Sequence, residues 1–188
     1  MKSLALTILL LLPVAAVAEP PFDGTWTLDL ETAQLSDKPE QIVLEDGRFQ
    51  APTSVPPIDV NADGTDRAAD APYFDTIAVS VVDDRTVRFR HKKDGKLVNE
   101  GTSTVTPDGN EIIDVFTYYP PEGAPVRGSG RRERVGGTVD GAHLISGAWR
   151  IKKVEQLGDS SLTWTFESTP GGLRMRAPTG ESSARKQP

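Results

Sequence analysis

Residues 76–119 read TIAVSVVDDRTVRFRHKKDGKLVNEGTSTVTPDGNEIIDVFTYY, and this stretch decides the fold class. Apolar and polar residues alternate with a period of two, as around Val87 and Phe89. Turn-forming pairs interrupt the alternation, for example Asp94-Gly95, because both residues tolerate the positive φ of a tight hairpin. The pattern predicts successive antiparallel strands joined by short turns.

The same alternation continues on both sides of this stretch, and no segment shows a sustained helical period. About ten short strands at regular spacing are typical of an antiparallel meander. Residues 126–135 are rich in Gly and Arg and are predicted as an edge strand. Because a closed sheet leaves no unpaired edge, we expect an all-β, up-and-down barrel, with an open β-sandwich as the alternative.

Composition narrows the classes of function. The 188 residues include 21 Lys and Arg against 27 Asp and Glu, a formal net charge of −6, which disfavours a nucleic-acid partner. The chain has no Cys, so disulfides, thiolate zinc sites and cysteine nucleophiles are excluded. Its two His residues exclude a multi-histidine metal centre as well.

The first 18 residues resemble an export signal rather than part of the fold. Lys2 precedes an apolar run, and Ala16-Val17-Ala18 has the small-x-small pattern that a signal peptidase accepts. The run is too short to cross the roughly 30 Å of a bilayer core, so no transmembrane anchor is expected. We predict cleavage before Glu19 and a periplasmic or secreted protein.

An internal repeat divides the mature chain. FDGTWTL at 22–28 resembles ISGAWRI at 145–151, and each copy places Gly-x-Trp at the start of an alternating strand. The predicted organisation is a barrel unit at 19–138, a truncated second repeat at 139–178 packed on the barrel, and a disordered tail at 179–188. An unpaired last strand in the second repeat would offer a surface for self-association.

Several segments resemble a family of secreted bacterial lipocalin-like proteins of uncharacterised function. They are FDGTWTL (22–28), VPPIDVNADGTD (55–66), VVDDRTV (81–87), KKDGK (92–96) and ISGAWR (145–150). The resemblance implies a barrel and no particular reaction. Relatives often carry a Cys-x-x-Cys pair where this chain has Ala51 and Ser54, so no role of that pair transfers.

A small barrel can either hold one small ligand or be filled by its own side chains. The residues expected to line a ligand cavity, or else to form a closed core, are Trp26, Phe89, His91, Phe116, Trp149 and Trp164. Asp114, among apolar neighbours, is expected to be a buried carboxylate. Arg131, Arg132 and Arg134 could receive an anion or simply form a solvated face.

Residues 59–70 form the best-patterned polar loop. Oxygen ligands at Asp59, Asn61, Asp63 and Asp70, with Gly64 at the sixth position, match the spacing of a calcium-binding loop. Flanking prolines and the shorter Asp at the last position favour a solvated acidic loop instead. We therefore predict no cofactor, with calcium bound by this loop as the alternative.

No catalytic motif accompanies these residues, so the chain is interpreted as more consistent with a binding protein than with an enzyme. The leading prediction is an exported, non-catalytic barrel that binds a small apolar molecule or a protein partner. The alternatives are a calcium-stabilised interaction or envelope module, and an enzyme with carboxylates at the barrel mouth.

Overall fold

The computed structural model describes residues 22–138, 140–158, 162–177 and 180–185, so the predicted signal segment 1–18 lies outside the described residues. The described strands are β1 (Gly24–Thr27), β2 (Glu40–Glu45), β3 (Arg48–Ala51), β4 (Ile58–Asn61), β5 (Arg67–Ala68), β6 (Thr76–Val81), β7 (Thr86–Lys93), β8 (Lys96–Val105), β9 (Glu111–Tyr118), β10 (Val126–Gly136), β11 (Gly147–Leu157), β12 (Thr163–Thr169), β13 (Gly172–Ala177) and β14 (Gly180–Arg185). The all-β prediction is confirmed. Among the described residues, no helix is long and apolar enough to span a membrane.

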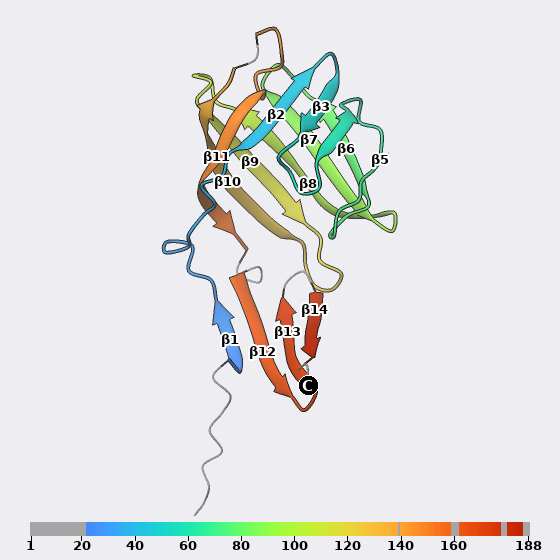
Figure 1. Ribbon diagram of the computed structural model, residues 1–188, viewed down its shortest axis with the longest axis vertical. Helices are drawn as coiled ribbons and strands as arrows, with labels where there is room; N and C mark the ends of the chain where they lie inside the picture. Colours follow the sequence, from blue (N-terminus) through green and yellow to red (C-terminus); the bar gives the residue numbers. More distant parts are fainter. Residues whose placement is uncertain (1–21, 139, 159–161, 178–179, 186–188) are drawn as a thin grey trace, which may run out of the picture.

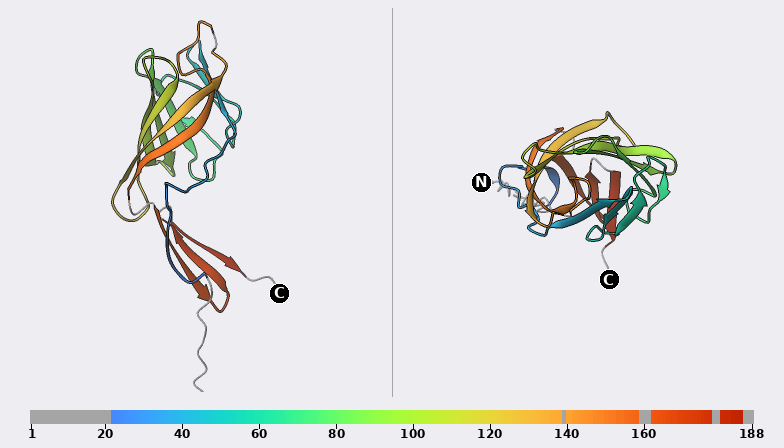
Figure 2. Two further views of the ribbon diagram at one scale, coloured as in Figure 1. Left: turned by 90° about the vertical axis from the view of Figure 1, so that its left-hand side faces the viewer. Right: turned by 90° about the horizontal axis from the view of Figure 1, so that it is seen from above.

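Ten strands form one antiparallel sheet in the order β4-β3-β2-β11-β10-β9-β8-β7-β6-β5. Seen from above, these strands run around a ring (Figure 2). Just after β4, the Gly64 N–H donates to the Val79 carbonyl of β6 at 2.7 Å, and Asp63 bridges to Ser80. The sheet is thus nearly closed into a barrel, as the alternation predicts.

The predicted turn at Asp94-Gly95 and a second Asp-Gly turn at Asp46-Gly47 both form hairpins, and their backbone explains the residue choice. Asp46 and Gly47 have φ values of 49° and 72°, and Asp94 and Gly95 have values of 49° and 73°. Positive φ at both central residues gives the turn a twist that matches the flanking strands. These turns fix the register of β2 with β3 and of β7 with β8.

The apolar core fills one half of the barrel, near the turns that join β6 to β7 and β8 to β9. Its most buried members include Val87, Val105 and Ile112, each at most 1% exposed. Phe49 packs edge-on against Phe89, with ring centroids 5.3 Å apart. Burying such side chains contributes about 1.5–3 kcal/mol each, so this half carries much of the stability of the fold.

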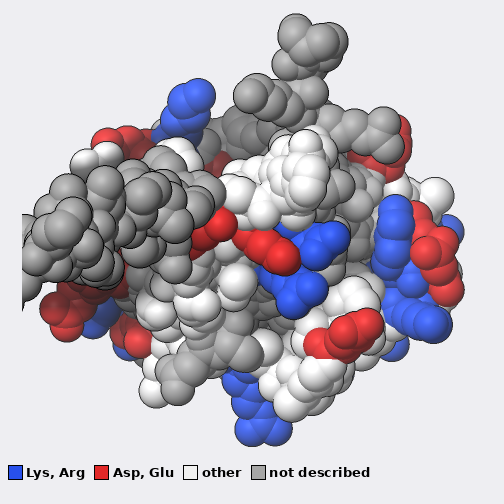
Figure 3. Space-filling model, turned by 90° about the horizontal axis from the view of Figure 1, so that it is seen from below, with Lys and Arg blue, Asp and Glu red and all other residues white. Residues whose placement is uncertain are grey.

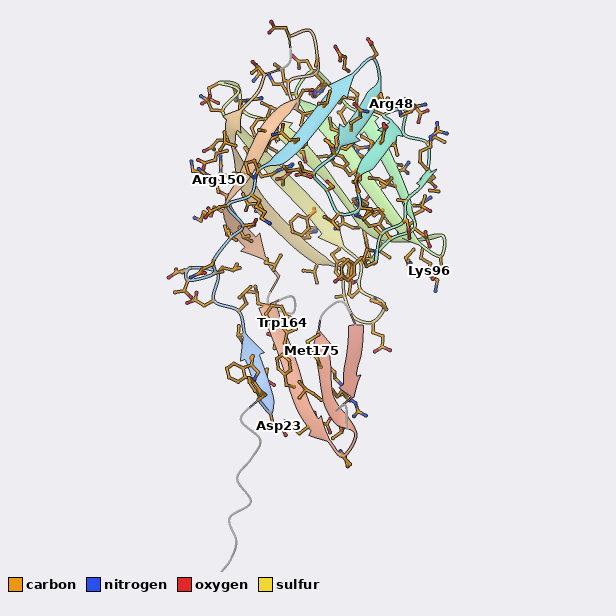
Figure 4. The ribbon with its side chains drawn as sticks, in the orientation of Figure 1. Asp23, Arg48, Lys96, Arg150, Trp164 and Met175 are labelled. Carbon is orange, nitrogen blue, oxygen red and sulfur yellow. The ribbon has the colours of Figure 1, made fainter. Side chains whose placement is uncertain are left out.

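A second, four-stranded sheet lies below the barrel in Figure 1, in the order β1-β12-β13-β14. Trp26 of β1 stands opposite Trp164 of β12 in its register. Trp164 and Met175 are both labelled in this sheet in Figure 4, away from the barrel. Trp26 is 49% exposed, and the buried core includes no residue of β1 or β12 and none of residues 172–176.

The predicted repeat is visible in the strand register. Leu44 pairs with Phe49 in the barrel, and Ser168 pairs with Leu173 in the small sheet, each 124 positions later. The two Trp side chains also match, since Trp26 Nε1 donates to the carbonyl four residues before it at 3.1 Å and Trp149 Nε1 does the same at 2.7 Å. The small sheet therefore repeats the β11-β2-β3-β4 part of the barrel.

The copies exchange their first strands, which moves the predicted boundaries. β11, from the second copy, lies between β2 and β10 and closes the barrel, whereas β1 pairs with β12. The barrel therefore extends past residue 138, and only the strands after β11 belong to the small sheet. Residues 180–185, expected to be disordered, form β14, and β10, expected at an edge, lies centrally between β9 and β11.

Candidate ligand cavity in the barrel

The half of the barrel away from the filled core holds an open cavity of about 580 Å³. Its wall comes from the linker between β1 and β2 and from β2 and β7 to β11. Its lining residues include Leu28, Leu30, Leu35, Glu40, Phe89, His91, Asn99, Gly101, Ser103, Asp114, Phe116, Gly130, Arg131, Arg132, Ile151, Lys153, Val154 and Leu157. Most of this wall is apolar, and the volume of the cavity falls within the range of roughly 300–1,000 Å³ that is typical of small-molecule sites.

A partly buried polar network lies between the filled core and the cavity. Arg132 donates from Nε and Nη2 to the two carboxylate oxygens of Asp114, at 2.8 and 2.7 Å. Ser103 donates to the same carboxylate at 2.5 Å and accepts from Arg132 Nη2 at 3.1 Å. The alternation that points apolar residues into the barrel puts these polar groups inward at one level, so they form a floor under the cavity.

Glu40 completes the network from β2. Its Oε2 accepts from Arg132 Nη1 at 2.8 Å, and its Oε1 accepts from the Ser54 hydroxyl at 3.0 Å. The Arg132 side chain is 13% exposed, against 39% for Glu40 and 25% for Asp114. Burial alone would lower the pKa of Arg132, but the two carboxylates more than offset it and the pKa is raised. The guanidinium is therefore charged, and the network carries one net negative charge.

His91 lies on the β7 side of the cavity. Its ring centroid is 4.4 Å from that of Phe74, at the edge of the apolar core. Burial lowers the pKa of His91, and a hydrogen bond with Asn99 offsets only part of this effect. The imidazole is therefore neutral at pH 7 and adds no charge to the cavity.

Glycines on the inner wall make room for Phe116. A Cβ at Gly128 would lie 2.3 Å from the Phe116 ring, and one at Gly101 would lie 2.6 Å from the Val115 carbonyl. Gly101, Phe116 and Gly128 are cross-strand neighbours in the register of β8, β9 and β10. The aromatic ring therefore lies flat against β10, and the space above it stays open.

Three of the six predicted ligand-binding residues line the cavity: Phe89, His91 and Phe116. Trp149 does not; it is 1% exposed in the filled core, with Arg134 4.0 Å from its ring centroid. Trp26 and Trp164 pair in the small sheet, outside the cavity. Aromatic residues mark both cores and cavities, and alternation alone does not tell which level of the barrel a strand position occupies.

The sequence pattern indicates only part of the polar network. Asp114 was expected to be a buried carboxylate, but neither Glu40 nor Ser103 carried any signal as its partner. Arg132 appeared only within a run of basic residues. The available signal was the alternation Gly128, Gly130, Arg132, which places an arginine on the same strand face as two inward glycines.

Two carboxylates of the predicted calcium loop make other contacts. Asp59 accepts two hydrogen bonds from Arg48, at 2.6 and 2.7 Å. Asp63 accepts from the Thr65 N–H at 2.9 Å and from Arg67 at 2.8 Å. Asn61 and Asp70 are exposed, and in the part of the chain that the structure describes no three His, Cys, Asp or Glu side chains are grouped to hold a metal ion.

On the outer surface, basic and acidic side chains are interspersed, as the view from below in Figure 3 shows. Comparison with known proteins found no matching family model, no matching curated protein and no matching solved structure. The kind of molecule that the cavity suits is therefore inferred from its lining residues alone. The cavity has an apolar wall for the body of a small molecule and a polar floor for one polar group.

Proposed function

We propose that this protein binds a small, largely apolar molecule in the hollow half of its barrel. The observation that carries the proposal is the cavity of about 580 Å³, which adjoins a tightly packed core in the same barrel. The predicted signal segment at 1–18 supports binding after export from the cytoplasm.

The arrangement of residues supports a binding cavity over a gap in packing. Gly101 and Gly130 line the cavity and have no side chain to occupy it, while Phe116 is held flat against Gly128. The apolar lining of an open cavity is in contact with water, which is unfavourable. A bound apolar molecule would remove that surface from water.

A fluorescent probe tests the proposal. N-phenyl-1-naphthylamine, which is neutral and emits strongly only in apolar surroundings, is titrated against the purified protein. We expect saturable emission, and Ile151→Trp should weaken the affinity by about tenfold or more, because Ile151 lines the cavity and a larger ring would occupy it. The matched control is Val135→Trp, since Val135 is 40% exposed on β10 and is not among the lining residues.

Emission that rises linearly without saturation would contradict the proposal. Equal affinity of the Ile151→Trp and Val135→Trp variants would also contradict it, because the probe would then bind elsewhere. Circular dichroism of both variants establishes that each retains the β-sheet signal before the affinities are compared.

A further inference from the structure

We infer that the ligand carries an amine head group, protonated at neutral pH, that binds against Glu40 and Asp114 on the floor of the cavity. This inference rests on the proposed function and specifies the class of ligand: an amphiphilic amine with an apolar body. The charge balance of the floor, its unused hydrogen-bonding capacity and the shape of the wall each support it.

The inward-facing charges leave the floor negative. Arg132 carries one positive charge and contacts both Asp114 and Glu40, so the network sums to one net negative charge. In a partly buried site this excess is screened less than on the surface. A cationic head group would neutralise it, whereas a carboxylate head group would double it.

Two other cations that border the cavity, Arg131 and Lys153, take no part in the network on its floor. Arg131 lies on the outward face of β10, where it pairs with Glu111 at 2.9 Å and Glu155 at 2.7 Å. Lys153 stands opposite Arg131 in the register and is exposed on the same outward face. Neither residue contacts Asp114 or Glu40 in the network, and burial keeps His91 neutral.

Hydrogen-bonding capacity gives the same preference. Arg132 commits Nε, Nη1 and Nη2 to the network through four contacts, out of the five N–H donors of a guanidinium. Each ionised carboxylate has about four acceptor positions. Glu40 accepts two contacts, from Arg132 and Ser54, so its acceptors remain in excess. The floor therefore has more to offer a donor such as an ammonium group than an acceptor such as a carboxylate.

The apolar wall determines what the rest of the ligand, beyond its head group, must be. Leu28, Leu30 and Leu35 of the linker and Ile151, Val154 and Leu157 of β11 contribute apolar surface to the same cavity as Glu40. An aliphatic or aryl-alkyl body lies against these side chains when the amine contacts the floor. Burying each methylene contributes about 0.8 kcal/mol in general, so the body supplies affinity and the head group supplies selectivity.

A set of probes with one chain length and three head groups tests the inference. Decylamine, decanol and decanoate compete with N-phenyl-1-naphthylamine at pH 7, at fixed ionic strength and below their micelle concentrations. We expect decylamine to displace the probe at the lowest concentration and decanoate at the highest, with about tenfold or more between them. Decanoate binding as well as or better than decylamine would overturn the inference.

Glu40→Gln removes one negative charge with little change in shape. We expect it to weaken decylamine by about tenfold while decanol binding is unchanged, so that decanol also reports that the variant is folded. Glu155→Gln is the matched control, because Glu155 pairs with Arg131 on the outward face, and it should leave all three affinities unchanged. An equal loss for decylamine and decanol in Glu40→Gln would overturn the inference.

Failure of the proposed function gives a different result from failure of the inference. Without a binding cavity, the probe does not saturate and none of the three competitors displaces it. With a cavity but no amine preference, the probe saturates and is displaced in the wrong order.

Discussion

Arg132→Met is the most informative single change in the barrel, because it removes the only cation of the buried network. The substitution leaves the carboxyl groups of Asp114 and Glu40 without the guanidinium that now lies between them. Removing one partner of a buried ion pair costs about 3–5 kcal/mol. Since 39% of the Glu40 side chain and 25% of that of Asp114 stay exposed to screening by water, we expect the lower end, about 3 kcal/mol.

Thermal unfolding followed by circular dichroism measures this cost. For a chain of this size each kcal/mol lowers Tm by about 2–4 °C, so Arg132→Met should lower it by about 6–12 °C. Arg131→Met is the matched control on the neighbouring position of the same strand. Arg131 pairs with Glu111 and Glu155 at the outward surface, so its loss should lower Tm by less than about a third as much.

A second variant separates charge from packing. Arg132→Met combined with Asp114→Asn and Glu40→Gln leaves no uncompensated charge on the floor, so most of the lost stability should return. If Arg132→Met and Arg131→Met lower Tm equally, or if the triple variant is as unstable as Arg132→Met, the buried network does not have the role described.

Three more predictions concern other parts of the barrel. Burial lowers the pKa of His91, so the stability tied to its neutral form is fully present above the unfolded pKa of about 6.5 and falls as the pH drops toward the folded value. His91→Gln should therefore reduce the change in the urea unfolding midpoint between about pH 7 and pH 5, and an unchanged slope would contradict this. Gly128→Ala should destabilise the fold because its Cβ would lie 2.3 Å from the Phe116 ring, and Phe116→Ala in the same chain should relieve that clash, so additive losses in a double-mutant cycle would refute the contact. Trp149→Ala should cost about 3–5 kcal/mol in urea unfolding, whereas Trp26→Ala, at a side chain 49% exposed, should cost clearly less; comparable losses would mean that the two repeats bury their tryptophans alike.

The strands and the barrel were predictable because their determinants are local. Alternation of apolar and polar residues identifies a strand with one buried face, and the positive φ at Asp94 and Gly95 is a property of that pair. Successive strands joined by such turns leave few topologies other than a meander. The exchange of β1 for β11 was not predictable, because both copies begin with Gly-x-Trp and only long-range pairing decides which copy joins β2.

The polar network on the floor of the cavity could not be predicted from the sequence for a related reason. The pairing of β10 with β11 shifts register at three places, between Ser129 and Gly130, between Arg131 and Arg132, and between Arg134 and Gly136. Each shift changes which residues of β11 lie opposite those of β10. Counting alternate positions along one strand therefore does not predict which residue of the next strand lies beside a given side chain. The contact of Arg132 with Glu40 joins residues 92 positions apart, and no pattern within either strand indicates it.

The position of β11 has a consequence for how the barrel is made. A ribosome completes β2 roughly 100 residues before β11 begins, about 5–20 s at ordinary rates of synthesis. Until β11 is present, β2 and β10 each keep an unpaired edge, and the apolar interior between them is open to water. The last barrel strand to be made thus has neighbours on both sides, and a chain that ends before residue 147 contains every other strand of the barrel but not the one that joins β2 to β10.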